Sequence, residues 1–510
     1  MAVVPMYLGW AVGLLFSFIV VRAVYRVTLH PLAKFPGPKL AGMTSLYQAW
    51  YDLRSSTSYI KQFHALHERY GPIVRITPSQ LHIFDMAAYN EIFKIGTRYA
   101  RHRDNYCQDA ADGFFNVLDP KAAKPWRDAY QPYFAKGAII RLEPLIHDRI
   151  GKFLSVLEEA ASSTGGTPVD LSMGYRSLTS DVVTSYMFAD KGFDLLDAEG
   201  FRSPILVALE EFFEFTQWYM YFPNFMGWLG RQLQRLTKEQ TEKLMPALAA
   251  TNWITEQCGI KVKRIMQEGG SGSSFPTVFD AWAKPSEKRS WTPTLKQLTA
   301  DAFTFHGAGT DTTAHTLTTA TWGLINNKEC LEKLRVELKA AIPTPNSEQL
   351  VSSSVLENLP YLRAVVKESL RMSMGVPGRL GRVVPEGGAV LCQQQIPAGV
   401  GITSVCYCYH YDPAYFPSPD EFRPERWLMG PESQQLESRL IAFSRGPRSC
   451  IGINLAYAEL YLTLGYVFRK FDVEAYATTH EDMEWKDNFV VTTKGHLRVK
   501  VTRAVDGEAD

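Results

Sequence analysis

One cysteine lies in a segment whose other residues suit a metal-binding thiolate, Phe443-Ser-Arg-Gly446-Pro-Arg448-Ser-Cys450-Ile-Gly452. The two glycines have no Cβ and allow tight turns and the close approach of a flat cofactor. Arg448 can reach an anionic group on such a cofactor. From Ile453 to Phe468 the apolar residues recur at helical spacing, so Cys450 precedes a helix N-terminus, where backbone N–H groups favour a negative sulfur. The segment therefore predicts a turn that presents a thiolate, followed by a buried helix.

A buried structural cysteine ahead of a core helix is the alternative interpretation, and it describes most lone cysteines of intracellular proteins. Five positions of the segment are fixed, and a chance match is on the order of one in ten thousand. The pattern resembles the haem-binding loop of the cytochrome P450 superfamily. The resemblance implies haem b as the cofactor, Cys450 as the ligand of its iron, and cofactor contacts for Phe443, Gly446 and Gly452.

The N-terminus predicts a membrane anchor. Residues Met1 to Val21 contain no charged side chain, and Arg22, Arg26 and Lys34 follow. The apolar run is long enough to span a bilayer, and its positive flank places the rest of the chain on the cytosolic side. A cleaved signal peptide is the alternative, but its charges would precede the apolar run and a small-residue cleavage site would follow it.

The next stretch, Pro31-Leu-Ala-Lys-Phe-Pro-Gly-Pro38, cannot continue a helix, because proline lacks the backbone N–H that a helix needs. It predicts a stiff hinge and resembles the proline-rich hinge of microsomal members of the superfamily. We therefore expect an anchor with its flank over residues 1–30, the hinge over 31–40 and a haem-thiolate monooxygenase domain over 41–510.

Composition restricts the partners. The 510 residues are 46% hydrophobic, which suffices for a large core, and 54 basic against 53 acidic residues give a net charge of +1. Such a balance argues against a nucleic-acid-binding surface. The seven cysteines are odd in number and scattered, unlike the framework of a secreted disulfide-rich protein. We therefore expect a reducing compartment and small or neutral partners.

Helical spacing of apolar residues dominates the middle of the chain, over 146–161, 172–189 and 238–267. Alternation over 73–84 predicts strands of a small sheet, and Gly and Pro punctuation with short runs such as Gly401 to Tyr409 predicts further strands and turns. Residues Phe489 to Val501 are expected to form a hairpin. The fold class is therefore mainly α with a minor β-sheet region, and the resemblance implies the cytochrome P450 fold preceded by an N-terminal transmembrane helix.

An apolar pattern from about Leu295 to Asn326 predicts one helix of about 45 Å. Gly307 and Gly309 lie near its centre, and each costs the helix roughly 1 kcal/mol relative to alanine. A ligand that approaches closely would explain them. An acid at Asp311 beside a hydroxyl at Thr312 can relay the protons that oxygen activation requires. A threonine-rich helix packed in a core is the alternative.

The same stretch resembles the distal oxygen-activation motif of the superfamily. Ala308, Gly309, Asp311 and either Thr312 or Thr313 occupy matching positions. The resemblance implies catalytic roles for the acid and the two threonines, and it places Ala308 and Gly309 against the cofactor.

Glu368 and Arg371 lie three residues apart on one face of a predicted helix, where opposite charges can pair. They precede Phe422-Arg-Pro-Glu-Arg426-Trp427, which precedes Cys450, in the order found in the superfamily. By resemblance Glu368, Arg371 and Arg426 form a buried charge network that supports the cysteine loop. Its role is structural, because groups so tied up have no free proton to give.

Haem propionates are anions, and the planar guanidinium group of arginine suits them. Arg448 is the first candidate, and Arg382 follows by resemblance. Arg127 is the third, although the usual pattern has an aromatic residue or histidine four positions earlier, where this chain has Ala123. The alternative register puts Tyr130 where arginine belongs. The sequence therefore leaves Arg127 open between a propionate ligand and an ordinary surface residue.

Two other sets of candidate metal ligands have simpler interpretations. Cys406-Tyr-Cys408-Tyr-His410 would place three such side chains on one face of a strand. A zinc site needs a fourth ligand, and none lies nearby in the sequence, so we expect ordinary strand residues. His306 is expected to be a core or pocket side chain rather than an iron ligand.

Aromatic residues gather between Glu211 and Trp228. Core packing explains them, and an apolar access channel or a lip that dips into the membrane is the alternative. By family position this segment forms the roof of a substrate pocket. The resemblance gives the same pocket Tyr106 to Leu118, Val376 to Leu380 and Phe489 to Val491 as further walls.

The ordered motifs imply a haem-thiolate monooxygenase that uses O2 to hydroxylate or otherwise oxidise an apolar small molecule. The segment from Tyr25 to Leu40 is similar to filamentous-fungal enzymes of secondary metabolism, so a terpenoid, polyketide or alkaloid-like substrate is expected. NADPH would supply electrons through a separate NADPH–cytochrome P450 reductase, because the chain has no room for a flavin domain. The expected location is the endoplasmic reticulum membrane, single-pass, with the catalytic domain cytosolic.

Two other classes stay open. A reductase-independent haem-thiolate isomerase or dehydratase needs no proton relay, so the pair of Asp311 and Thr312 argues against it. A non-catalytic haem-binding protein has no use for an aromatic channel and an oxygen-activation motif.

Overall fold

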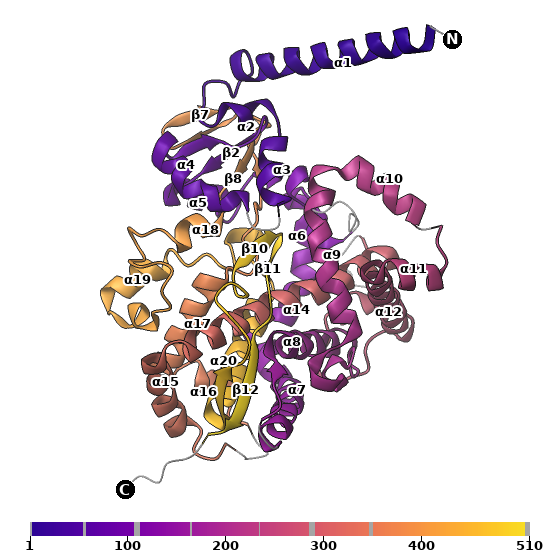
Figure 1. The fold of residues 1–510 in the computed structure, drawn as a ribbon. Helices are drawn as coiled ribbons and strands as arrows, with labels where there is room; N and C mark the ends of the chain where they lie inside the picture. The colour runs from indigo at the N-terminus through magenta and orange to yellow at the C-terminus, as the bar shows by residue number, and fades with distance from the viewer. Residues whose placement is uncertain are drawn as a thin grey trace.

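The computed structural model describes residues 3–54, 58–106, 113–163, 166–233, 235–284, 291–345 and 350–504. It is mainly helical, with short strands gathered in small sheets (Figure 1), as the sequence predicts. The C-terminal tail beyond residue 504 lies outside the described residues.

The helices and strands are numbered along the chain. The α-helices are α1 (Val3–Thr28), α2 (Lys39–Met43), α3 (Leu46–Asp52), α4 (Phe63–Tyr70), α5 (Met86–Phe93), α6 (Pro120–Tyr130), α7 (Lys136–Ser162), α8 (Leu171–Phe188), α9 (Pro204–Tyr221), α10 (Pro223–Leu233), α11 (Lys238–Leu244), α12 (Pro246–Glu268), α13 (Asp280–Ala283), α14 (Leu295–Ile325), α15 (Lys328–Ala341), α16 (Ser353–Leu356), α17 (Pro360–Ser373), α18 (Cys406–His410), α19 (Pro431–Glu437) and α20 (Ile453–Lys470). The strands are β1 (Ile73–Arg75), β2 (Gln80–Ile83), β3 (Ala100–Arg101), β4 (Val169–Asp170), β5 (Arg382–Val383), β6 (Ala389–Leu391), β7 (Gln394–Ile396), β8 (Gly401–Thr403), β9 (Phe471–Ala475), β10 (Trp485–Asn488), β11 (Val490–Thr493) and β12 (Arg498–Arg503).

Helix α14 runs through the middle of the molecule and packs against α8, α12, α17 and α20 (Figure 1). Its N-cap is Thr294, whose side chain accepts the Gln297 N–H in a capping box. Glycine lets two neighbours come close. A Cβ at Gly309 would lie 2.9 Å from the Val183 side chain of α8, and one at Gly323 would lie 2.5 Å from Phe422.

A five-stranded sheet in the order β1-β2-β8-β5-β3 forms a second layer near the N-terminus. Strands β2 and β8 are parallel, and the other pairs are antiparallel. The sheet has its own apolar core with α4 and α5, separate from the large helical core around α14. Its last pairing places Arg101 directly opposite Arg382.

Three local predictions were wrong. Cys406, Cys408 and His410 are not strand residues, because β8 ends at Thr403 and these three lie on the helix α18 that follows. Residues 489–501 do not form one hairpin: β11 pairs with β10, whereas β12 pairs with β9 and β4. Residues 238–267 divide into α11 and α12 at Met245, whose backbone is non-helical ahead of Pro246.

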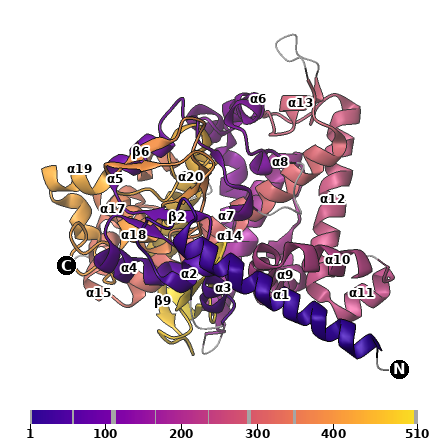
Figure 2. The ribbon, with the colours of Figure 1, turned by 90° about the horizontal axis from the view of Figure 1, so that it is seen from above.

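Helix α1 extends away from the folded body (Figures 1 and 2). Within the described residues it is the one helix long and apolar enough to cross a membrane, over Trp10–Thr28, and none of that window is buried. Its C-terminal end is fixed to the domain. Arg75 Nη1 donates to the Arg26 carbonyl over 2.7 Å, and Arg26 Nη1 donates to the Met43 carbonyl over 2.6 Å.

The predicted charge network of Glu368, Arg371 and Arg426 is confirmed. Arg371 donates two hydrogen bonds of 2.9 Å to the two oxygens of Glu368, and Arg426 Nε donates a third over 3.1 Å. The Trp427 indole N–H also donates to Glu368, over 2.9 Å. Glu368 and Arg371 are fully buried, so the hydrogen bonds must replace the water that these charges lose.

His410 connects this network to the loop that carries Cys450. Its Nδ1 lies 2.9 Å from the Arg371 carbonyl, and its Nε2 lies 3.0 Å from the Ile441 N–H. Burial, reinforced by Arg371, lowers the pKa of His410 to about 3, so the ring is neutral. Nδ1–H therefore donates and Nε2 accepts. Ser444 N–H in turn donates to the Ile441 carbonyl, at the start of the cysteine loop.

We predict that Glu368→Gln lowers the free energy of unfolding by about 3–5 kcal/mol, because it leaves Arg371 and Arg426 buried beside a neutral amide. Denaturant unfolding followed by circular dichroism measures the change. The matched control is Glu357→Gln, which removes an exposed partner of Lys136 and is expected to cost less than about 1 kcal/mol. Equal losses in the two variants would contradict a supporting role for the buried network.

Candidate functional site

The loop before α20 presents Cys450 between two constrained turns. The Cys450 N–H donates to the Phe443 carbonyl over 2.9 Å, which closes the loop on itself. Gly446 has a φ of 70°, and a Cβ there would collide with the Phe93 carbonyl of α5. Gly452 is the N-cap of α20. The two glycines therefore hold the loop against α5 and allow it to turn into the helix.

The protein alone does not favour a thiolate at Cys450. Burial raises the pKa of the thiol, although a hydrogen bond from the Gly452 N–H and the nearby Arg127 oppose that effect. The helix N-terminus thus contributes in the expected direction but is outweighed. Although protein atoms surround the sulfur, the residue as a whole keeps accessible surface, so a metal ion can reach the sulfur, and coordination removes a thiol proton outright.

Four arginines gather beside this loop. Arg101 and Arg382 face each other across β3 and β5, and Arg382 Nη1 donates to the Tyr106 hydroxyl over 2.7 Å. Arg448 donates to the carbonyls of Val117 and Phe114, over 2.9 and 3.2 Å. The fourth member is Arg127 of α6, which reaches the loop at the residue before Cys450.

The cluster carries positive charge that the described residues do not neutralise. Its hydrogen bonds go to carbonyl and hydroxyl oxygens, and none of the four guanidinium groups pairs with a carboxylate in the described ranges. Burial, then the neighbouring arginines, lower the pKa of Arg448 to about 8 and that of Arg101 to about 10. Both side chains also bury an Nε without a hydrogen-bond partner. An anionic group would relieve this crowding.

Arg127 faces the cysteine loop and not the outer surface. Its Nη1 donates to the Ser449 carbonyl over 2.8 Å and its Nη2 to the Ser449 hydroxyl over 3.2 Å. The alternative register leads elsewhere, because the Tyr130 hydroxyl donates to Asp301 over 2.7 Å. Burial raises the pKa of that carboxyl to about 7, although Tyr130 and the Phe114 N–H oppose the rise. Of the two candidates on α6, Arg127 is therefore the one that hydrogen-bonds to the loop.

The second motif lies on α14, which packs against α20. Ala308 is exposed within the fold, and the Thr312 hydroxyl donates to its carbonyl over 2.8 Å. A Cβ on Gly375 would lie 3.4 Å from Thr312, so the segment after α17 approaches the same point. Thr313 is buried on another face. The absence of a side chain at Gly309 leaves space for Val183 of α8, and this packing explains the glycine. Its contact with a cofactor stays a prediction.

Asp311 does not point freely toward its neighbour Thr312. Arg176 Nε of α8 donates to Asp311 Oδ1 over 2.8 Å, and both side chains are about 10% exposed. Burial raises the pKa of Asp311, and Arg176 acts against that rise. The acid of the motif is therefore held by a cation that the sequence analysis did not identify. His306 is a core side chain as expected, with Nε2 3.0 Å from the Ser180 hydroxyl.

Aromatic side chains continue from the arginine cluster toward α14. Tyr106 and Phe115 have ring centroids 5.4 Å apart, and Phe115 and Phe489 are 6.0 Å apart. Phe489 has a φ of 78° at the turn between β10 and β11, a conformation that a bulky residue adopts only under constraint. Residues 107–112 of the expected pocket loop lie outside the described residues. On α9 and α10, Phe215, Trp218, Phe225 and Trp228 are exposed.

Sequence reasoning missed Arg101 and Arg176. Arg101 stands in a two-residue strand, where no periodicity marks it, and only the pairing with β5 brings it to Arg382. Arg176 lies in a helix that is buried along almost its whole length. A charged residue at a position of such a helix is the one signal that could have marked it, because an unpaired charge is rarely buried.

Comparison with known proteins identifies the chain. The family model described as cytochrome P450 matches residues 36–501. The chain is 35% identical to cytochrome P450 monooxygenase sdnE of Sordaria araneosa, over 94% of this chain and 95% of the relative. It is 32% identical to cytochrome P450 monooxygenase macH of Penicillium terrestre over 97% of each chain, and 32% identical to cytochrome P450 monooxygenase TRI4 of Fusarium sporotrichioides over 99% and 98% of the two. The chain therefore belongs to the cytochrome P450 family and is a P450 monooxygenase, for which family membership implies a haem-thiolate cofactor.

Proposed function

We propose that this enzyme hydroxylates or otherwise oxidises an apolar intermediate of secondary metabolism, with electrons that NADPH supplies through a separate reductase. The balanced reaction is RH + O2 + NADPH + H⁺ → ROH + H2O + NADP⁺. The observation that carries the proposal is the pair of motifs on packed helices: Cys450 immediately before α20, and Asp311 with Thr312 on α14.

The residues around Cys450 fit haem b. Cys450 would supply the thiolate ligand, and the exposed Ala308 of α14 would leave room for the cofactor. The haem propionates would be neutralised by the arginine cluster, namely Arg448, Arg382, Arg127 and Arg101. The negative charge would also offset the repulsion among these arginines. Phe443, Gly446 and Gly452 would shape the loop against the cofactor, and Gly309 would contact it from α14. When bound, haem b supplies a redox-active iron that activates O2 with electron density from the thiolate.

Asp311 and Thr312 would move the protons that the reaction consumes. The Thr312 hydroxyl already donates within α14, so it can exchange that hydrogen bond for one to a group in the site. Asp311 can deliver a proton only after it leaves Arg176, because a guanidinium group keeps its own protons. Thr313, the other threonine of the motif, is buried and would act by holding the helix in place.

The substrate is expected to be apolar, of terpenoid, polyketide or alkaloid-like type. The wall between the arginine cluster and α14 is formed by Phe115 and Phe489, with Val491 hydrogen-bonded to Gly375 behind them. Such a wall offers apolar area and few hydrogen-bonding groups, which selects for apolar molecules. Resemblance of the N-terminal segment to fungal enzymes of secondary metabolism narrows the class to these products.

Helix α1 would anchor the enzyme in the endoplasmic reticulum membrane as a single span. Residues 1–30 would be the anchor with its flank, 31–40 the hinge, and 41–510 the cytosolic catalytic domain. Support comes from the apolar window Trp10–Thr28 and from the basic residues at its end, which favour the cytosolic side.

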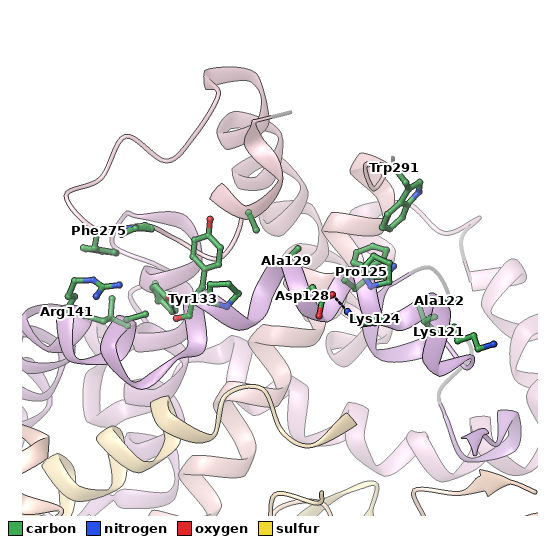
Figure 3. Close-up of a pocket in the computed structure, with 18 residues that line it drawn as sticks. Lys121, Ala122, Lys124, Pro125, Asp128, Ala129, Tyr133, Arg141, Phe275 and Trp291 are labelled. Carbon is green, nitrogen blue, oxygen red and sulfur yellow. Dashed lines mark hydrogen bonds and ion pairs between the residues drawn. The ribbon is translucent and has the colours of Figure 1, made fainter. Parts of the chain in front are cut away.

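The reductase would dock on the outer side of α6. A groove of about 1110 Å³ lies there, with Lys121 toward one end and Arg141 toward the other (Figure 3). Its floor includes Trp126, and the next residue, Arg127, contacts the cysteine loop on the inner side of the helix. An acidic partner is thus attracted to a place one helix away from Cys450.

We predict that Thr312→Ala uncouples the reaction. NADPH oxidation with reductase is expected to continue, while product falls about 10-fold or more and hydrogen peroxide rises, because protons arrive too slowly. The control is Thr319→Ala, whose hydroxyl makes the same bond to a carbonyl four residues back on α14. Product formation that does not depend on reductase would instead identify an isomerase or dehydratase.

We predict that Cys450→Ser abolishes the reduced carbon-monoxide spectrum typical of thiolate-ligated haem, since serine offers no thiolate. Visible spectroscopy of the reduced protein under carbon monoxide measures it. Cys408→Ser, at a buried cysteine of α18, is the control and should keep that spectrum. Survival of the spectrum in Cys450→Ser would make the ligand assignment wrong.

We predict that Lys121→Glu combined with Arg141→Glu lowers reductase-driven turnover about 10-fold, because two charge reversals repel an acidic partner. Turnover driven by added hydrogen peroxide needs no reductase and should stay unchanged. Lys339→Glu on α15, an exposed position away from α6, is the matched control. Loss of turnover under both conditions would point to damage of the site and not to lost docking.

A further inference from the structure

Five charged side chains of alternating sign connect α14 to the surface. They are Asp311, Arg176, Glu210, His496 and Asp170. Arg176 Nη1 donates to Glu210 Oε1 over 2.9 Å, in addition to its bond to Asp311. His496 then lies between two carboxylates, with Nε2 3.0 Å from Glu210 and Nδ1 2.6 Å from Asp170. The known motif accounts for Asp311 only.

The five residues come from separate elements that this chain of charges ties together. Asp170 ends β4 and caps α8, where it accepts the Met173 N–H over 3.1 Å. Glu210 belongs to α9, and His496 lies in the segment between β11 and β12. Backbone bonds fix that segment to the start of α8: Leu497 N–H donates to the Ser172 hydroxyl, and Leu171 N–H donates to the Leu497 carbonyl, each over 2.9 Å.

Exposure of the side chains is greatest at Glu210 and His496. Glu210 is 38% and His496 is 23% exposed, whereas Asp311 and Arg176 are about 10% and Asp170 is 6% exposed. Hydrogen bonds to Asp170 and Glu210 raise the pKa of His496 to about 9, so the ring is a cation at neutral pH and both its nitrogens donate. The network therefore meets solvent at Glu210 and His496, and its Asp311 end lies in the motif on α14.

Arg176 is shared by two carboxylates, those of Glu210 and Asp311. Without Glu210 in place, the full attraction of Arg176 would fall on Asp311 and keep that carboxylate ionised and bound. Glu210 also raises the pKa of Asp311 directly, although burial is the larger cause of the rise. The position of Glu210 thus decides how readily Asp311 takes up a proton and leaves Arg176 for the side of Thr312.

We propose that His496 is a positioning residue for proton delivery: it holds Glu210 on Arg176 and so allows Asp311 to rotate away from Arg176. The proposal rests on the proposed function, because it assigns the protons of that reaction a controlled entry. The His496 ring bonds to Glu210 and Asp170, and among the described residues it makes no hydrogen bond or ion pair with Asp311 or Thr312. It acts through two other side chains, and its effect should appear in the fate of the oxygen that the enzyme reduces.

The test compares His496→Gln, Glu210→Gln and the double variant with the wild-type enzyme, given NADPH, reductase and O2 without added substrate. The electrons then reduce O2 either to hydrogen peroxide, O2 + 2e⁻ + 2H⁺ → H2O2, or to water, O2 + 4e⁻ + 4H⁺ → 2 H2O. Each single variant is expected to raise the ratio of peroxide to water about 3- to 10-fold. The ratio in the double variant should not exceed that of the stronger single variant, because both changes interrupt the same network of charges.

Two controls separate positioning from folding. His480→Gln removes an exposed histidine of the C-terminal region that contacts Trp322 and no member of the network, and it should leave the ratio unchanged. The reduced carbon-monoxide spectrum reports an intact site in every variant. If His496→Gln does not fold, Glu210→Gln on α9 decides the question, since its side chain is partly exposed.

A ratio within about 1.5-fold of the wild type in both single variants, or additive effects in the double variant, would overturn the role of His496. These outcomes differ from a failure of the proposed function. If the wild-type enzyme oxidises no NADPH with reductase, the monooxygenase proposal itself fails. If Thr312→Ala raises peroxide and His496→Gln does not, only the positioning role is lost.

Discussion

The carboxylate of Glu368 is fully buried, and the position of the cysteine loop depends on how it is compensated. Two bonds from Arg371, one from Arg426 and one from the Trp427 indole occupy its oxygens. Through the carbonyl of Arg371 the arrangement also orients the neutral ring of His410, which receives the Ile441 N–H. Displacement of any partner would leave a buried charge without a hydrogen bond and without water to replace it. The support beneath the cysteine loop is therefore fixed in place.

The arginine cluster beside the loop has the opposite character. Arg101, Arg127, Arg382 and Arg448 donate to carbonyl and hydroxyl oxygens, and burial, together with the neighbouring arginines, lowers the pKa of Arg101 and of Arg448. Burying such charges costs free energy that the polypeptide alone does not return. An anion would complete a site with this imbalance, and we propose that the two propionates of haem b supply it, because they have the required charge.

Sequence reasoning identified what depends on local spacing. The glycines around Cys450, the helix over Leu295–Ile325 and the pair of Glu368 and Arg371 follow from turn chemistry and helical periodicity. It failed where distant segments decide the outcome: β12 pairs with β9 and β4, so residues 489–501 do not form the expected hairpin. Sequence reasoning did not identify Arg101 and Arg176 for the same reason. Only tertiary contacts bring Arg101 to Arg382 and Arg176 to Asp311.

Three buried charged groups of this enzyme thus differ in how completely they are neutralised, and that difference separates their roles. Glu368 is saturated with donors and cannot move without loss. The arginines lack an anion among the described residues. Asp311 lies between these limits, because its partner Arg176 is shared with the partly exposed Glu210. An acid that alternates between two positions needs such partial pairing. Complete pairing with a cation would immobilise it, and without any cationic partner it would stay protonated and would not be drawn back to its first position.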